Sequence, residues 1–278
     1  MALAPESTRI GPTNPVSEPW LVALDIDGTI IDFDATMTPA VKDAVRDVRD
    51  AGHEVILASG RSVLAMMPIV RRLGLESGWL VASNGAVTAH IDPAADPGYV
   101  LDTVITFDPG PVLRLLAAEF PSARFAAEDL GIGFHVTQKY PDGELMGRQI
   151  LASVEELCGR SITRLIVRGD ESPEAFREHV ISAGLADVSY FIGHTAWMDV
   201  SPPGTSKATA LEKLRAHLDA PHQRTLAVGD GDNDTDMIRW AARGVAMGQA
   251  PAAVREAADE VTGSVKEDGL VPVLHSLL

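Results

Sequence analysis

The chain has 278 residues, of which 46% are hydrophobic and 22% charged, and its formal net charge is −16. This length allows one large domain or two modest ones, and the negative charge excludes a general affinity for nucleic-acid backbones, because no excess of cations is present to displace their counterions. The single cysteine, Cys158, excludes an intramolecular disulfide, and no apolar run has the length of a membrane span.

The first nineteen residues, 1–19, are rich in proline and contain no apolar core of a signal peptide, so they predict a disordered tail. The absence of that signal, together with the cysteine usage, favours a cytoplasmic location. The first ordered element follows directly, because residues 21–24 form an apolar run typical of a strand buried on both faces of a parallel sheet.

Two carboxylates end this strand, since Asp25 and Asp27 are followed by Gly28 and Thr29. Ligands bind at the carboxyl ends of strands in open α/β sheets, and alternate residues of an extended segment point to the same side. Asp25 and Asp27 therefore face one small volume, where a pair of carboxylates favours a cation. An acidic turn is the alternative, because Asp and Gly are common turn residues.

A second strand, 53–58, runs into Ser59, Gly60 and Arg61 after a helix that begins at Pro39. A hydroxyl and successive backbone N–H groups ahead of the next helix, 63–73, are suited to a phosphate oxygen. From the residues alone, Ser59 is equally compatible with a helix cap, and Arg61 with a solvent-facing side chain. A third strand, 79–83, ends in Asn84-Gly85, which on local grounds is a strong hairpin signal.

The stretch 87–195 predicts a second α+β unit whose strands alternate apolar and polar residues, as in an antiparallel sheet with one open face. The expected strands are 100–107, 122–127, 133–138, 162–167 and 188–192, and the expected helices are 111–120, 144–158 and 173–183. Six polar side chains of this unit are candidates for reaching a substrate, and the sequence does not rank them: Arg124, His135, Lys139, Tyr140, Arg164 and His194.

A lysine, Lys207, begins the next predicted helix, 207–218, where the helix dipole favours anions instead. This placement indicates a bound anion, although a surface lysine is the alternative. The strand 225–228 then runs into Asp230, Asn233 and Asp234, and the two acidic strand ends together supply hard oxygen ligands suited to Mg²⁺. Helices at 235–242, 251–257 and the C-terminus alternate with strands at 245–247 and 260–262.

These motifs resemble those of the haloacid dehalogenase superfamily: Asp-Ile-Asp-Gly-Thr at 25–29, Ser59, Lys207, and Gly-Asp-Gly-Asp-Asn-Asp at 229–234. The segments 245–248 and 267–269 resemble the Cof-type sugar-phosphatase branch in particular. The resemblance implies an α/β fold, with a Rossmann-like, doubly wound parallel-sheet core formed by 20–86 and 196–278. It also implies an inserted α/β cap, 87–195, that closes over the site and selects the substrate.

The resemblance further implies a role for each motif residue. Asp25 is the nucleophile that forms an aspartyl-phosphate, Asp27 is the acid and base, and Lys207 holds both the phosphate and the nucleophile. Mg²⁺ is bound by the side chains of Asp25 and Asp230 and by the backbone carbonyl of Asp27. Phosphate-binding residues are Thr29, Ser59, Gly60, Arg61, Asn84 and Lys207, while Asn233 and Asp234 support the metal or the lysine. Gln249 stands where the family often has asparagine.

The expected function is therefore a Mg²⁺-dependent phosphatase for a small phosphorylated metabolite, with a sugar phosphate as the leading class. The alternatives are a phosphosugar mutase of the phosphomannomutase type, a phosphatase for a flavin or pyridoxal phosphate cofactor, and a catalytically silent binding module. Aromatic residues make up only 5% of the chain, which offers no obvious ring-stacking platform. No nucleic-acid or membrane partner is expected, and the oligomeric state is not readable from the sequence.

Overall fold

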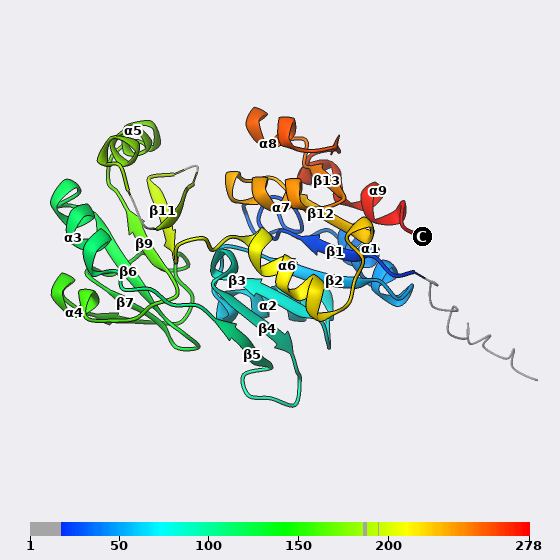
Figure 1. The fold of residues 1–278 in the computed structure, drawn as a ribbon, viewed down its shortest axis with the longest axis horizontal. Helices are drawn as coiled ribbons and strands as arrows, with labels where there is room; N and C mark the ends of the chain where they lie inside the picture. Colours follow the sequence, from blue (N-terminus) through cyan, green and yellow to red (C-terminus); the bar gives the residue numbers. More distant parts are fainter. Residues whose placement is uncertain (1–17, 186–187, 194) are drawn as a thin grey trace, which may run out of the picture.

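The computed structural model describes residues 18–185, 188–193 and 195–278. Most of the expected disordered tail, together with His194, lies outside these ranges. The described chain forms an eight-stranded and a six-stranded sheet, which lie side by side in two units (Figure 1). Within the described ranges, no helix combines the length and the hydropathy that crossing a membrane requires.

The eight-stranded sheet has the order β14-β13-β12-β1-β2-β3-β4-β5; β14 to β3 run parallel, and β4 and β5 are antiparallel additions. Its strands are β1 (Leu21–Leu24), β2 (Glu54–Ala58), β3 (Trp79–Ala82), β4 (Val87–Ile91), β5 (Tyr99–Val104), β12 (Thr225–Gly229), β13 (Arg243–Ala246) and β14 (Glu260–Val261). Its helices are α1 (Pro39–Asp50), α2 (Val63–Leu73), α6 (Lys207–His217), α7 (Thr235–Trp240), α8 (Ala252–Ala257) and α9 (Leu270–His275). Short 3₁₀ turns are η1 (Ser83–Gly85), η2 (His222–Arg224), η3 (Asp232–Asp234) and η4 (Val265–Glu267).

Both faces of β1, at the centre of this sheet, are buried, as its apolar run predicts. Val22 and Leu24 pack in one cluster with α1, α2 and α9, whereas Leu21 and Ala23 pack in another with α6 and α7. All four side chains are 1% exposed or less, because alternate residues of a strand point to opposite faces and helices cover each face. The expected doubly wound, Rossmann-like α/β core is confirmed.

The six-stranded sheet has the order β10-β11-β9-β6-β7-β8 and is antiparallel except between β7 and β8. It lies in the segment expected to form the cap, and its unit is called the cap below. Its strands are β6 (Arg124–Asp129), β7 (Gly133–Val136), β8 (Arg148–Leu151), β9 (Leu165–Arg168), β10 (Ser189–Ile192) and β11 (Trp197–Ser201). Its helices are α3 (Gly110–Glu119), α4 (Val154–Cys158) and α5 (Pro173–Ala183). These helices lie on the side of the cap sheet that is turned away from the core (Figure 1), which leaves the other face toward it.

The division between the two units differs from the expected boundaries at 86/87 and 195/196. β4 and β5 belong to the core sheet, because β4 pairs with β3 across the η1 turn and buries Val87, Ala89 and Ile91 in the core cluster. β11 belongs to the cap sheet, where Met198 and Val200 are fully buried. The cap therefore extends from about 105 to about 201.

The expected helix over 144–158 is wrong, because this segment holds β8 and the five-residue α4. Gly147 has a φ of 96°, and a Cβ at this position would lie 2.6 Å from the carbonyl oxygen of Ile132. The backbone at this glycine therefore passes close to the start of β7. The helix begins only after Ser153, whose hydroxyl and backbone form a capping box with Glu156.

Candidate active site

Four strands deliver the motif residues to one edge of the core sheet. Asp25 follows β1, Ser59 follows β2, Asn84 lies in the turn after β3, and Asp230 follows β12. The strands are parallel neighbours, so their carboxyl ends meet at the same edge. Lys207 reaches this edge from the first turn of α6, where Ser206 caps the helix by accepting the backbone N–H of Thr209.

Lys207 is completely buried and is held between two carboxylates. Its Nζ donates to Oδ1 of Asp25 and to Oδ1 of Asp234, each at 2.6 Å. Burial alone would lower the pKa of Lys207, but the adjacent charges of Asp234 and Asp25 outweigh this effect and hold the pKa above its ordinary value. The lysine is therefore a fixed positive charge beside the expected nucleophile.

Three buried carboxylates, those of Asp25, Asp230 and Asp234, have oxygens within 4.8 Å of one another. Burial raises the pKa of Asp25 well above its usual range, and the charge of Asp234 adds to the shift. Burial, again with Asp234, raises the pKa of Asp230 to about 7. One lysine does not balance three carboxylates, so the cluster has the charge and the hard oxygen donors that suit a divalent cation such as Mg²⁺.

Asp234 has both oxygens engaged by the protein. Its Oδ1 accepts from Lys207, and its Oδ2 accepts the backbone N–H groups of Asp230 at 3.0 Å and Gly231 at 2.9 Å. Asp25 and Asp230 are therefore better placed than Asp234 to bind a metal. Asp234 instead holds Lys207 and the loop after β12 in place.

Gly28 is required by a close approach between the two acidic strand ends. Its φ is 82°, and a Cβ at this position would lie 2.1 Å from Oδ2 of Asp230. Gln249 supports the same contact, since its Nε2 donates to the Gly28 carbonyl at 2.6 Å and to Oδ2 of Asp230 at 3.1 Å. Its Oε1 accepts the backbone N–H of Val265 at 3.0 Å. The glutamine amide thus joins the turn after β1 to the loop after β12.

Arg61 contacts Asp27 through two parallel hydrogen bonds, from Nε to Oδ2 at 2.7 Å and from Nη2 to Oδ1 at 2.6 Å. The sequence interpretation assigned Arg61 to the phosphate, whereas the structure places it on the expected acid and base. These hydrogen bonds raise the pKa of Arg61. Both side chains are partly exposed, so the pair lies at the rim of the site and not in its buried centre.

Ser59 is buried, and its hydroxyl accepts the backbone N–H of Arg61 at 3.1 Å. It is not a helix cap, because Ser62 caps α2 by accepting the backbone N–H of Ala65. Gly60 lies between them, where an added Cβ would come within 3.3 Å of the Asn84 amide. The serine hydroxyl is therefore held at the strand end, next to the turn that carries Asn84.

Asn84 is fully buried in the left-handed conformation, with a φ of 53°, and its Oδ1 accepts from Nδ2 of Asn233 at 3.0 Å. Within the described structure, its Nδ2 has no partner, and neither has the buried hydroxyl of Thr29. Buried polar groups are normally hydrogen-bonded. Two such groups without partners, both among the expected phosphate-binding residues, fit a site that is completed by a ligand.

The chain matches the family described as haloacid dehalogenase-like hydrolase over residues 22–98 and 147–274. The chain belongs to this family. The resemblance inferred from the sequence, to the Cof-type branch of the haloacid dehalogenase superfamily, is thereby confirmed.

Curated relatives of this hydrolase include two Bacillus subtilis proteins. The 5-amino-6-(5-phospho-D-ribitylamino)uracil phosphatase YitU is 27% identical, with 93% of this chain and 97% of the relative covered. The putative phosphatase YkrA is 30% identical, with 92% and 97% covered. The pyridoxal phosphate phosphatase YbhA of Escherichia coli is 24% identical, with 93% and 98% covered.

Solved structures agree with the fold. A phosphatase of the haloalkanoate enzyme superfamily from Bacteroides thetaiotaomicron superposes with a TM-score of 0.74 and 27% identity, and 96% of this chain and 98% of that chain are covered. A subclass IIB sugar phosphatase of the superfamily has a TM-score of 0.76 at 21% identity, with 93% and 98% covered, which shows the fold alone.

Sequence reasoning did not single out Phe191 and Trp197, two cap residues of this hydrolase that line a cavity together with Asp27 and Asp230. Among the six candidates, Arg164 borders a cavity beside Arg61 and pairs with Asp199, whose side chain is 15% exposed. Tyr140 is buried and donates to the Arg124 carbonyl, His135 pairs with Asp129, and Lys139 donates to the Gln149 carbonyl. Trp197 and Phe191, which do line the site, carry no local sequence signal.

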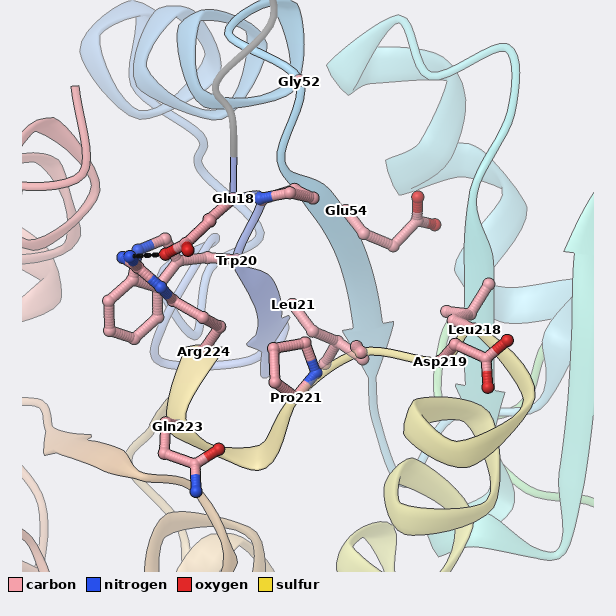
Figure 2. A pocket seen from close by; sticks show the side chains of 12 residues that line it. Glu18, Trp20, Leu21, Gly52, Glu54, Leu218, Asp219, Pro221, Gln223 and Arg224 are labelled. Carbon is pink, nitrogen blue, oxygen red and sulfur yellow. Dashed lines mark hydrogen bonds and ion pairs between the residues drawn. The ribbon is translucent and has the colours of Figure 1, made fainter.

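A large cavity lies away from this chemistry. It has a volume of about 580 Å³ and lies at the opposite edge of the sheet, where β1 and β2 begin (Figure 2). Trp20 and the ion pair between Glu18 and Arg224 form one side of it. None of the motif residues lines this cavity, so size alone does not identify the active site of this family member.

Proposed function

We propose that this protein is a Mg²⁺-dependent phosphatase that hydrolyses a small phosphorylated metabolite through an aspartyl-phosphate on Asp25. The observation that carries the proposal is the buried contact of Lys207 with Asp25 at the carboxyl edge of the sheet, beside the acidic cluster. The expected class of enzyme, a phosphoric monoester hydrolase, agrees with the curated relatives, which are named as phosphatases.

Hydrolysis of a phosphate monoester is among the slowest uncatalysed reactions, so several groups must act together. Asp25 attacks phosphorus, which divides the displacement into two easier steps. Asp27 gives a proton to the departing alcohol and later takes one from the attacking water, an effect typically worth about 10²–10⁴-fold. Arg61 donates to both oxygens of Asp27, so one oxygen must leave this contact and carry a proton before Asp27 acts as the acid.

Lys207 neutralises charge on Asp25 and on the phosphoryl oxygens, while Ser59, Gly60, Asn84 and Thr29 offer hydrogen bonds to the remaining oxygens. Asp25, Asp230 and the carbonyl of Asp27 would hold Mg²⁺. When bound, the metal supplies positive charge that offsets the three carboxylates and the substrate dianion. Asn233 supports the site by donating to Asn84, and Asp234 supports it by accepting from Lys207.

A sugar phosphate is the leading substrate class that the sequence resemblance implies. Relatives whose names specify a phosphorylated uracil derivative or pyridoxal phosphate keep a phosphorylated cofactor as the second class. A phosphosugar mutase remains the alternative reaction, which would return the phosphoryl group to a sugar instead of to water. We assign substrate selection to the cap, because cap residues of β10 and β11 line a cavity together with Asp27 and Asp230.

The test is phosphate release from phosphorylated sugars, nucleotides and cofactors, with and without Mg²⁺, in the parent protein and in Asp25→Asn. The control is Asp219→Asn, an exposed position at the opposite sheet edge whose φ of 50° asparagine tolerates. We expect metal-dependent release by the parent and the control, and none by Asp25→Asn. Release that needs a sugar bisphosphate would establish the mutase instead, and Mg²⁺-independent release in Asp25→Asn would exclude the proposed chemistry.

A further inference from the structure

The turn that carries Asn84 has an unusual backbone. Ser83, Asn84 and Gly85 are consecutive residues with φ angles of 49°, 53° and 97°, all in the left-handed region. Glycine adopts this region freely and asparagine tolerates it, whereas it is strained for serine. Strained residues persist where the surrounding structure holds them, and they are concentrated at functional sites. The contacts that hold this turn therefore bear on the expected phosphate site.

Core residues hold the backbone of the turn and one end of the Asn84 amide. The Ser83 N–H donates to the Arg61 carbonyl at 2.8 Å, and the Asn84 N–H donates to the Ser59 carbonyl at 3.1 Å. Nδ2 of Asn233 donates to Oδ1 of Asn84 at 3.0 Å. In the described structure Nδ2 of Asn84 has no partner, so it is the group left to donate to a phosphoryl oxygen. The direction of this donor depends on the turn that carries it.

The cap supplies a further contact to this turn. Oε2 of Glu128, on β6, accepts the Ser83 hydroxyl at 2.6 Å, and both side chains are buried. Glu128 is itself fixed within the cap sheet, because its N–H donates to the Arg164 carbonyl at 2.9 Å and its Oε2 also accepts the Thr163 hydroxyl at 2.8 Å. Among the described residues, the other hydrogen bonds of Ser83 are to the core, so Glu128 is its hydrogen-bond partner from the cap.

The shared oxygen of Glu128 links the cap to the strained part of the turn. A hydroxyl that donates to a carboxylate makes a stronger hydrogen bond than a neutral pair does, and breaking it in a buried place leaves polar groups without partners. The contact therefore opposes movement of Ser83 away from its left-handed conformation. Because Asn84 is the next residue, any shift of Ser83 would also move the Asn84 amide.

We infer that Glu128 is a positioning residue for phosphate binding, because through Ser83 it holds the turn that directs Nδ2 of Asn84 at the phosphoryl group. A cap residue thus completes the phosphate site without touching the phosphate itself. The inference rests on the proposed phosphatase function and deepens it, since the cap then takes part in phosphate binding as well as in substrate selection.

The test separates the two hydroxyls that Glu128 accepts. Ser83→Ala removes the contact between core and cap, whereas Thr163→Val removes the contact within the cap and is the matched control, because each variant leaves Oε2 with one donor. Glu128→Leu removes both contacts, and Glu128→Gln keeps an oxygen that can accept them. The readouts are the inhibition constant Ki of inorganic phosphate, which does not depend on how much enzyme is folded, and kcat/KM for the ester that the parent hydrolyses best.

We expect Ser83→Ala and Glu128→Leu to raise Ki about three- to thirtyfold and to lower kcat/KM, since a misdirected donor loses part of a hydrogen bond to a charged group. Thr163→Val should keep Ki near the parental value, and Glu128→Gln should retain most of the affinity that Glu128→Leu loses. An unchanged Ki in Ser83→Ala, or an equal rise in Thr163→Val, overturns the inference. Phosphate release by the parent in that case shows that the phosphatase function stands, whereas no release from any ester of the panel removes both proposals.

Discussion

Lys207 shows how one residue connects the fold to the proposed chemistry. Its position at the start of α6 opposes the helix dipole, and its Nζ is nevertheless buried, because Asp25 and Asp234 each accept a hydrogen bond from it. The anion that this placement indicated in the sequence is thus present in the protein itself, as two carboxylates. A phosphorylated Asp25 would keep a negative charge at the same point.

Replacing Lys207 by methionine should damage both activity and stability. The variant leaves two buried carboxylates without their cation, which costs about 3–5 kcal/mol in other buried pairs, and removal of a charge-stabilising donor lowers kcat by about 10²–10³-fold. Lys213→Met, an exposed position on the same helix, is the control. Denaturant unfolding and phosphate release measure the two effects, and a variant as stable as the control would contradict the central role of this ion pair.

The acidic cluster makes the stability of the metal-free protein depend on pH. The folded protein raises the pKa of Asp230 from 3.8 to about 7, so the folded state binds this proton more tightly than the unfolded chain does. The free energy of unfolding therefore falls as pH rises from about 4 to about 7. The raised pKa of Asp25 shifts stability in the same direction. Lys207 stays charged throughout this range, because its pKa is also raised.

Mg²⁺ binds the deprotonated carboxylates, so it should raise Tm more at about pH 8 than at about pH 5; at 100 times Kd the gain is about 2.7 kcal/mol. Melting curves with chelator and with excess Mg²⁺ measure this difference. Asp230→Asn should abolish most of it, and an increment that is equal at both pH values in the parent would count against metal binding at this cluster.

At the scale of elements, the turn after β1 and the loop after β12 are fitted to each other. Gly28 allows Oδ2 of Asp230 to approach its backbone, and the Gln249 amide joins the two segments. Two strands separated by about two hundred residues thus hold one site, because their parallel pairing aligns their ends.

Gly28→Ala should separate these segments, whereas Gly74→Ala is a matched control. Both glycines have left-handed φ angles, 82° and 72°, so each substitution costs about 1–3 kcal/mol in backbone strain. Only at Gly28 does the new Cβ meet Asp230, while Gly74 has nothing within 4 Å. We expect loss of Mg²⁺-dependent phosphate release in the first variant and near-parental activity in the second. Equal activity in both would show that the close approach is dispensable.

The elements also show which parts of the fold were predictable from the sequence. The core strands and helices were predictable, because apolar runs, caps and glycines are local signals. The helix cap at Thr38 and the helix end at Gly74 illustrate this. The Asn84-Gly85 hairpin signal agrees with the antiparallel pairing of β3 with β4, although the expected boundary at 86/87 assigned the strands after it to the cap. The helix expected over 144–158 failed, because the pairing of β8 with β7 depends on contacts distant in sequence.

The same distinction applies to the site. The motif residues at strand ends converge as expected, since parallel pairing follows from the fold class. The partnership of Arg61 with Asp27 could not be predicted, because side-chain orientation at a strand end is set by tertiary packing. Trp197 and Asp199 belong to a cap whose strand order has no sequence motif, so their position opposite the core carboxylates emerged only from the structure.

At the scale of the whole molecule, a buried and an exposed polar contact are among those that join the cap to the core. Oε2 of Glu128, a buried residue of β6, accepts the hydroxyl of Ser83 at 2.6 Å and that of Thr163 at 2.8 Å. Ser83 immediately precedes Asn84, so this contact ties the cap to the expected phosphate site. The pair of Arg177 with Asp232 is exposed and lies at the rim of the cavity that Asp27 and Asp230 line.

The two contacts should respond differently to truncation. Glu128→Ala leaves two buried hydroxyls without partners and should cost about 1–3 kcal/mol of stability, with a fall in kcat as the turn holding Asn84 loosens.

Arg177→Ala removes an exposed pair worth about 0–1 kcal/mol, so stability should stay near the parental value while KM rises by a factor of up to about five. Glu178→Ala, an exposed carboxylate of α5, is the control for both. Unfolding and steady-state kinetics separate the effects; if Arg177→Ala lowered kcat with KM unchanged, the rim pair would act on the chemical step and not on cap closure.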